Sequence, residues 1–474
     1  MDRLPRPPES FFEGTPPHVR AYIEQLHGVI DHLYSVIETH EARIAELEAR
    51  LRQTSRNSSQ PPSSDGPHVK PAPPRPPSGR KRGGQPGHAK RERTILPPDE
   101  VHDHKPLQCH RCDTALRGDD PDPVLDQVIE LPVKLRHVIH HRRHTLTCPG
   151  CSQATTASSV PEAASGFGPR VQATVAYLAG VGRLGKRAIR QFFADLCDIP
   201  LSLGMVSKLE RKTSAALAPL HAETLAATQG QDANIDETGW KQGAKRAWLW
   251  VARTAKATAF LIRPTRGRAA FDDLRTNAAG ILITDRYPVY DHLPVARRQL
   301  CWAHLRRDFQ AMIDRDDAGA QVGRDLLLHA DILFRHWNRV RDGTLTRPGF
   351  HRTYAWLRTE VRTLLVRGTA CGSAKTQTVC EGLLPIEAAL WTFTRHDGIE
   401  PTNNAAERAL RHAVCWRKTS FGTDSEPGSR FVERLLTVVA TARQHGHAIL
   451  ARITDAIHAV RMDTERPSLI ACRV

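Results

Sequence analysis

Apolar residues recur at a seven-residue spacing along residues 19–51. Steps of three and four residues alternate without a slip, as in a coiled coil. One set of apolar positions holds Ile23, Ile30, Ile37, Ile44 and Leu51, and the other holds Leu26, Leu33, His40 and Leu47. Isoleucine in the first set and leucine in the second favour a parallel dimer, so we expect a leucine zipper. A single amphipathic helix packed against its own chain is the alternative.

The spacing typical of β-strands begins near residue 231. Short runs rich in β-branched and aromatic residues predict strands at 231–236, Ala247–Arg253, Ala257–Arg263 and 280–283, with a helix at Arg268–Thr276 before the last. The short link between the second and third strands predicts a hairpin. Asp236 and Asp285 stand at the ends of the first and fourth strands. Adjacent strands of a mixed sheet can bring these two acids side by side.

Helical spacing dominates the regions on either side of this sheet. Residues 168–222 predict helices joined by a turn, with Ser202 as a cap, which is the pattern of a helix-turn-helix. Lys208 and Arg211 would then face a DNA groove, although a plain helical hairpin gives the same pattern. Apolar spacing also predicts a helical insertion at about 305–400 and a C-terminal helical segment at 431–474.

Residues 54–93 have almost no apolar side chains and are rich in proline and serine. Such a segment cannot bury a core, so we expect it to be disordered. Its second half is basic, and Arg80, Lys81 and Arg82 are candidates for contacts with DNA phosphates. A linker that only increases solubility is the alternative.

Two Cys-x-x-Cys pairs lie within residues 100–160: Cys109 with Cys112, and Cys148 with Cys151. Four thiolates complete a tetrahedral zinc site, and two Cys-x-x-Cys motifs in one domain are typical of zinc ribbons. We therefore expect one structural Zn²⁺ per chain. Four unconnected thiols are the alternative.

Asp236, Asp285 and Glu407 are the candidate catalytic acids. Close carboxylates repel one another unless a cation lies between them, and hard oxygen ligands suit Mg²⁺ or Mn²⁺. Two such ions can assist the cleavage of a phosphodiester. Glu407 lies just inside a helix predicted to begin near Asn403, and Arg408 and Arg411 follow it as candidate DNA contacts. Taken singly, such acids are more often turn residues or members of solvated ion pairs.

The charge of the chain indicates a polyanionic partner. It has 474 residues, a net charge of +16 and a pI of about 9.7. No apolar run reaches membrane-spanning length, and the first residues lack the apolar core of a signal peptide. We therefore expect an intracellular protein, cytoplasmic and associated with the nucleoid, whose ten cysteines are mostly reduced.

At the acids and around them, the chain resembles bacterial Asp-Asp-Glu transposases of the insertion sequence 66 family. The matching stretches are Asp236 to Trp240, Asp285 with Tyr287 and Tyr290, Cys301 to His304, Pro401 to Arg411, and Trp416 to Thr423. The resemblance implies a ribonuclease-H-like core with Asp236, Asp285 and Glu407 as catalytic acids, and small accessory proteins from the same element. Arg286 departs from the glycine more common in this family, and arginine fits poorly where φ is positive.

Together these observations predict a multidomain α/β protein. Its parts would be a coiled coil at 19–51, a basic linker at 54–93, a zinc-binding domain at 100–160, a helical DNA-binding region at 168–222, a ribonuclease-H-like domain at 230–430 that contains the insertion, and a helical segment at 431–474. The expected function is that of a dimeric transposase, a polynucleotidyl transferase with two Mg²⁺ or Mn²⁺ per active site. A catalytically inactive zinc-dependent DNA-binding regulator and a hydrolysing nuclease of the same fold are the alternatives.

Overall fold

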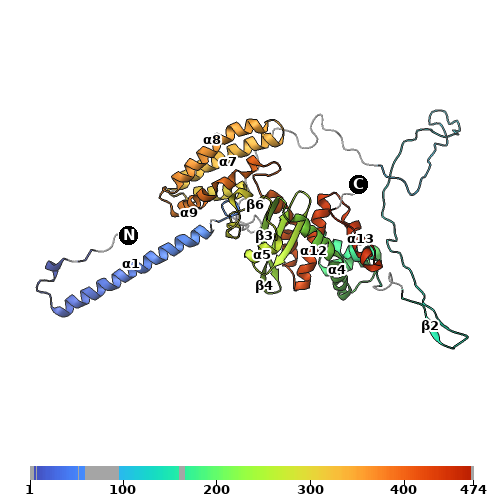
Figure 1. The fold of residues 1–474 in the computed structure, drawn as a ribbon, viewed down its shortest axis with the longest axis horizontal. Helices are drawn as coiled ribbons and strands as arrows, with labels where there is room; N and C mark the ends of the chain where they lie inside the picture. Colours follow the sequence, from blue (N-terminus) through green and yellow to red (C-terminus); the bar gives the residue numbers. More distant parts are fainter. Residues whose placement is uncertain (1–4, 7, 52, 59–94, 160–165, 471–474) are drawn as a thin grey trace.

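A five-stranded mixed sheet with helices against both faces forms the centre of the molecule (Figure 1). The computed structural model describes residues 5–6, 8–51, 53–58, 95–159 and 166–470. The predicted α/β class is confirmed, since the chain combines helices with this mixed sheet. The basic residues Arg80, Lys81 and Arg82, with most of the predicted 54–93 linker, lie outside the described residues.

The strands of this sheet run in the order β5-β4-β3-β6-β7. Strands β3 (Ala233–Gln242), β4 (Lys245–Arg253) and β5 (Thr258–Arg263) form an antiparallel meander. Strand β6 (Leu282–Thr284) pairs in parallel with β3, and β7 (Arg298–Leu300) pairs in parallel with β6. The predicted hairpin between the second and third strands is therefore confirmed.

One prediction about β3 is wrong: the strand does not end at Asp236 but continues to Gln242. The polar run after Asp236 suggested a turn, yet each of these residues has a partner on β4, from Asp236 opposite Val251 to Gln242 opposite Lys245. The turn comes later, at Gly243, whose φ of +59° suits a tight hairpin. Asp236 consequently lies within β3, opposite Val251 of β4.

The two faces of the sheet belong to separate hydrophobic cores. Helices α4 (Leu203–Thr228), α11 (Asn404–Ser420) and α12 (Glu426–Gln444) cover one face, where Leu249 and Val251 are buried. The short helix α5 (Arg268–Leu274) packs against the other face, where Ile235, Trp250 and Leu261 are buried. Successive residues of β3 therefore face different surroundings.

The predicted helix-turn-helix region packs onto this sheet. Helices α2 (Pro169–Gly180) and α3 (Lys186–Cys197) precede α4, and α13 (Ile449–Met462) packs against α2 and α4. Ser202 caps α4 as expected, because its hydroxyl accepts a hydrogen bond of 3.1 Å from the Met205 amide. These helices share one hydrophobic core with the sheet and with α12.

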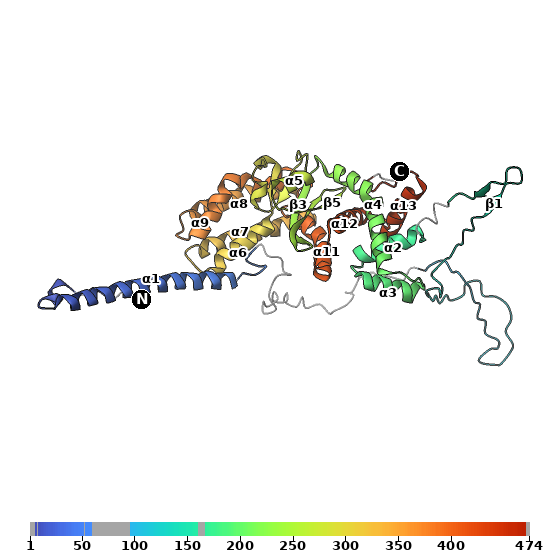
Figure 2. The same cartoon turned by 90° about the horizontal axis from the view of Figure 1, so that it is seen from below.

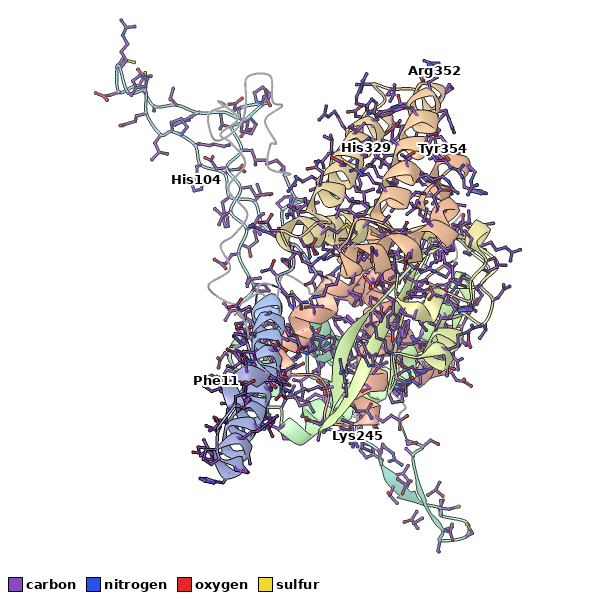
Figure 3. The ribbon with its side chains drawn as sticks, turned by 90° about the vertical axis from the view of Figure 1, so that its left-hand side faces the viewer. Phe11, His104, Lys245, His329, Arg352 and Tyr354 are labelled. Carbon is purple, nitrogen blue, oxygen red and sulfur yellow. The ribbon has the colours of Figure 1, made fainter. Side chains whose placement is uncertain are left out.

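The region between β7 and α11 is helical and has its own core. It consists of α6 (Trp302–Asp314), α7 (Ala320–Arg341), α8 (Arg347–Gly368), α9 (Ala374–Leu383), η6 (Leu384–Leu390) and α10 (Thr392–Arg395). The Trp302 amide donates to the carbonyl of Pro401, 2.9 Å away, so the two ends of this insertion meet. Figure 3 shows Arg352 of α8 at the end of the molecule opposite Lys245 of the β3–β4 hairpin.

The N-terminal part extends away from the sheet. After the short η1 (Glu9–Phe12), helix α1 (Pro17–Leu51) projects as a single long rod (Figure 2). Strands β1 (Thr145–Thr147) and β2 (Ala154–Thr156) form a small hairpin around the second cysteine pair. Among the described helices, none combines the length and the apolar character that crossing a membrane requires.

Candidate active site

The parallel pairing of β3 with β6 brings Asp236 and Asp285 together. Ala233 lies opposite Leu282 and Asn234 opposite Ile283, so the same register continued by two residues puts Asp285 beside Asp236. The entry to β6 passes tightly under β3, because a Cβ on Gly280 would lie 2.3 Å from the carbonyl of Gln231. The Asp285 carboxylate then accepts a hydrogen bond of 2.9 Å from the Tyr287 amide, which orients it.

Asn403 fastens the Glu407 helix to β3. The sequence suggested that this residue caps α11, but its side chain makes no capping hydrogen bond. Its side-chain nitrogen instead donates to the carbonyl of Ile235 at 2.7 Å, and its side-chain oxygen accepts a hydrogen bond of 3.0 Å from the side chain of Asn234. Both partners directly precede Asp236 in the strand. Asn403 is fully buried, so it sets the approach of Glu407 to the aspartates, a role that sequence reasoning missed.

The three acids lie close enough to affect one another electrostatically. Burial, followed by the charges of Glu237, Asp285 and Glu407, raises the pKa of Asp236 well above its usual range. Among the described residues, neither Asp236 nor Asp285 forms an ion pair. The three predicted acids therefore interact electrostatically, although their oxygens do not all lie within 4.8 Å of one another in the described part of the chain. A bound metal ion would reduce the repulsion among them.

A fourth acid, Glu237, belongs to the opposite face of the sheet. Its buried carboxylate accepts hydrogen bonds from the Arg266 Nε at 2.7 Å and from the Tyr290 hydroxyl at 2.7 Å. The Arg266 guanidinium also lies over the Tyr287 ring, 3.6 Å from its centroid. Glu237 and Tyr290 stand in two of the matched motifs, and this network gives them a supporting role beneath the aspartates.

Glu407 also faces α6, the first helix of the insertion. Its Oε1 lies 3.6 Å from a guanidinium nitrogen of Arg307 and 3.8 Å from the Nδ1 of His304. The donor atoms of Cys301, His304 and Glu407 all lie within 4.8 Å of one another. Burial raises the pKa of Cys301 to about 12, and its sulfur accepts a hydrogen bond of 3.1 Å from the Asn403 amide. A neutral thiol in this position supports the packing of α6 against α11.

Arg286 does not adopt the positive φ that a glycine at this position would allow. Among the described residues with positive φ, Arg286 is not found. Its guanidinium forms an ion pair of 2.8 Å with Asp308 of α6. The turn after Asp285 is thus compatible with arginine, and it is tied to the insertion.

Each predicted cysteine pair lies in the same kind of turn. The amides of Asp113 and Ser152, four residues after Cys109 and Cys148, donate to the carbonyls of those cysteines, and both have φ between 54° and 58°. Hydrogen bonds lower the pKa of Cys112 and of Cys148, which favours thiolates. The four sulfurs do not all lie within ligand distance of one another. Among the described residues, the group that does meet this condition is Cys301, His304 and Glu407.

The remaining predicted DNA contacts that the structure describes are on the surface. Lys208 and Arg211 are exposed on the outer side of α4. Arg408 and Arg411 are exposed on α11, beside and one turn beyond Glu407. These four residues are therefore accessible to a large ligand.

The comparison with known protein families agrees with this site. Residues 164–431 match the model described as "Transposase IS66 family", a span that contains the sheet, the insertion and all three acids. The chain belongs to the IS66 transposase family. Residues 14–94 match a family of unknown function, DUF6444.

Two similar proteins are known from Sinorhizobium fredii. The uncharacterized protein y4qI is 27% identical over 231 residues, which are 42% of this chain and 41% of that protein. The uncharacterized protein y4hP is 25% identical over 430 residues, 78% of this chain and 73% of that protein. The chain thus spans less than half of y4qI and about three quarters of y4hP.

The unpaired carboxylates generate a prediction about stability. A carboxyl group whose pKa is raised by folding contributes stability at low pH and loses it as pH rises above the ordinary value of 3.8. Asp236→Asn removes this repulsion, so in EDTA at neutral pH its melting temperature should exceed that of the wild type, by about 2–4 °C for each kcal/mol relieved. Thermal unfolding followed by circular dichroism measures the change.

The gain should disappear below pH 3.8, where the wild-type carboxyl group is also protonated. Asp291→Asn is the control, because Asp291 is exposed and forms an ion pair with Arg298. A lower melting temperature for Asp236→Asn at neutral pH would contradict the electrostatic account.

Proposed function

We propose that this protein is a DNA transposase that cleaves the ends of a bacterial insertion sequence and transfers the strands into target DNA. The observation that carries the proposal is the convergence of Asp236, Asp285 and Glu407 within a chain of the IS66 transposase family. The net charge of +16 supports a polyanionic substrate. The five-stranded mixed sheet with helices on both faces supports a ribonuclease-H-like core.

Asp236, Asp285 and Glu407 would hold two Mg²⁺ or Mn²⁺ ions. Their mutual repulsion fits hard divalent cations, as does the finding that the two aspartates form no ion pair with any residue that the structure describes. Such ions, when bound, supply an activated water and stabilise the leaving oxygen of a phosphodiester. The chain itself fixes the geometry: β3 and β6 hold the aspartates in register, and Asn403 holds the Glu407 helix against β3.

The same site would serve both steps of the reaction. In the first, water attacks the phosphodiester at an element end and leaves a 3′-hydroxyl group. In the second, that hydroxyl attacks a phosphodiester of the target, so one bond forms as another breaks. Exposed Lys208, Arg211, Arg408 and Arg411, with the basic segment containing Arg80, Lys81 and Arg82, would contact the DNA backbone.

The N-terminal regions would assemble the active complex. The apolar stripe of α1 is uncovered, with Leu33 52% and Ile44 56% exposed, which supports a zipper between two chains. The lowered thiol pKa values and matched turns of the two cysteine pairs support Zn²⁺ binding by Cys109, Cys112, Cys148 and Cys151. A dimer can hold two DNA ends at once. Small accessory proteins from the same element would be further partners.

The catalytic proposal predicts the effect of amide substitutions. Asp236→Asn, Asp285→Asn and Glu407→Gln each keep the side-chain shape but remove a charge that holds a cation. Each should reduce strand cleavage of an element end by roughly 10³-fold or more, and combining them should add little, because the three act as one unit. Gel assays with Mg²⁺, Mn²⁺ or Ca²⁺ measure cleavage, and Ca²⁺ should support little of it.

Glu400→Gln is the matched control. Glu400 is another glutamate near the end of the helical insertion, but its carboxylate accepts a hydrogen bond from the indole of Trp337. Normal cleavage by Glu407→Gln would remove the third acid from the site. If the wild type binds DNA without cutting it, the protein is a regulator. If it cuts without joining, it is a nuclease.

The zinc proposal predicts metal content. The purified wild-type protein should carry one Zn²⁺ per chain. The double variant Cys109→Ser, Cys148→Ser should lose this metal, since each cysteine pair loses a thiolate. Elemental analysis gives the ratio. Cys197→Ser, at a partly buried cysteine of α3, should keep the metal. Full zinc in the double variant would exclude these ligands.

The dimer proposal predicts a change of mass. Ile30→Asp, Ile37→Asp introduces two charges into the apolar stripe of α1 and should give a monomer by light scattering. Ser35→Asp, Ala42→Asp introduces the same charges on the opposite side of the helix and should leave the dimer intact. An unchanged mass for the first variant would show that the zipper does not dimerise the chain.

A further inference from the structure

A basic cavity of about 270 Å³ lies between α11, α12 and the edge of the sheet. Its lining comes from the adjacent strands β4 and β5 and from helices α11 and α12. Helix α12 contributes one continuous row, at spacings of three and four residues, and α11 contributes the residues just after Glu407. The residues that bear the argument are Arg253, Arg408, His412, Arg443 and Gln444.

The charge of this cavity is uncompensated. Of the described residues that line it, none carries a carboxylate. Within the described part of the chain, the half-buried Arg253 and the exposed Arg408 and Arg443 take part in no ion pair, whereas the half-buried Arg266 and Arg430 do. Burial and the charge of Arg408 lower the pKa of Arg253. Two guanidinium groups therefore repel each other across a cavity where an anion would hold them together.

Arg253 is held in place by a chain of hydrogen bonds. Its Nη1 donates to the hydroxyl of Thr258 at 3.2 Å, and that hydroxyl donates to the side-chain oxygen of Gln444 at 2.9 Å. The Gln444 side-chain nitrogen donates in turn to the carbonyl of Thr254 at 2.9 Å. This network uses only one of the five N–H donors of the Arg253 guanidinium group, so the others can donate hydrogen bonds to a ligand.

The cavity adjoins the three acids. Arg253 lies directly opposite Asn234 in the β3–β4 pairing, and residues opposite each other point to the same face of a sheet. That face also carries Asp236, two residues along β3. Arg408 immediately follows Glu407 on α11. A ligand in the cavity would therefore lie on the same face of the sheet as the phosphodiester proposed to be cut at the acids.

We propose that this cavity binds a phosphate group of the DNA backbone next to the phosphodiester that is cut, with Arg253, Arg408 and Arg443 as its ligands. The proposal rests on the proposed transposase function. Guanidinium groups match the tetrahedral oxygens of phosphate, and they pair with it through two hydrogen bonds each. The volume exceeds the 30 Å³ or so of one water molecule several-fold, which leaves room for the sugar attached to the phosphate. Held there, the strand cannot slide along the acids.

DNA binding by the full-length protein tests the proposal. The probe is a fluorescent duplex of random sequence, titrated at several salt concentrations. For the double variant Arg253→Gln, Arg443→Gln, the slope of log affinity against log salt should fall by about 0.9, because one phosphate contact is lost. Affinity at low salt should fall about ten-fold or more. The double variant Arg452→Gln, Arg466→Gln removes the same charge near α13 and should keep the wild-type slope.

Inorganic pyrophosphate is the second probe. It should raise the melting temperature of the wild type but not that of Arg253→Gln, Arg443→Gln. Without anion this variant should melt no lower than the wild type, because a repulsive pair has been removed, so a lost response is not a lost fold. Asp236→Asn should lose cleavage but keep the wild-type salt slope and pyrophosphate response.

These measurements separate the two proposals. Unchanged DNA affinity and salt slope in Arg253→Gln, Arg443→Gln would overturn the DNA-phosphate site. If pyrophosphate still stabilised the wild type selectively, the cavity would instead bind a free phosphate compound. Normal cleavage by Asp236→Asn would defeat the catalytic proposal and leave the basic cavity standing.

Discussion

Repulsion among carboxylates governs the centre of this molecule. Asp236, Glu237, Asp285 and Glu407 gather around the middle of β3 and the end of β6, and like charges at such distances are costly. The fold treats them in two ways. Glu237 is buried on one face, where its carboxylate accepts hydrogen bonds from Arg266 and Tyr290. Asp236 and Asp285 form no ion pair among the described residues, so the other face is the one on which we propose that cations bind.

Two neighbours in the sequence thus have opposite functions because a strand alternates its side chains. Glu237 makes the sheet rigid beneath the site, and Asp236 stays chemically available above it. Asn403 uses the same alternation, because it bonds to the Ile235 carbonyl and the Asn234 side chain while Glu407 approaches Asp236. Buried amide and guanidinium groups therefore hold the site in place, whereas the proposed reactivity would depend on the unpaired carboxylates.

Much of this arrangement was predictable from local patterns. Apolar runs gave the strands on either side of the acids, the β4–β5 hairpin and the insertion, because these depend on periodicity over a few residues. The continuation of β3 beyond Asp236 was not predictable in this way, since its polar residues are stabilised by pairing with β4. The role of Asn403 was missed for a similar reason: a capping residue and a residue that bonds to a distant strand look alike in sequence. The basic cavity likewise joins residues almost two hundred positions apart.

The helical insertion leaves and rejoins the sheet at one point, where Trp302 bonds to Pro401 and Cys301 bonds to Asn403. Because its ends already touch, its length places little entropic demand on the rest of the fold. Evolution can therefore lengthen, shorten or exchange this region as a cassette while the sheet stays unchanged. The limit on such exchange is the junction itself. A replacement must still place a helix start at residue 301 that accepts a hydrogen bond from the backbone amide of Asn403. Without it, α11, which carries Glu407, would lose one of its fixed contacts.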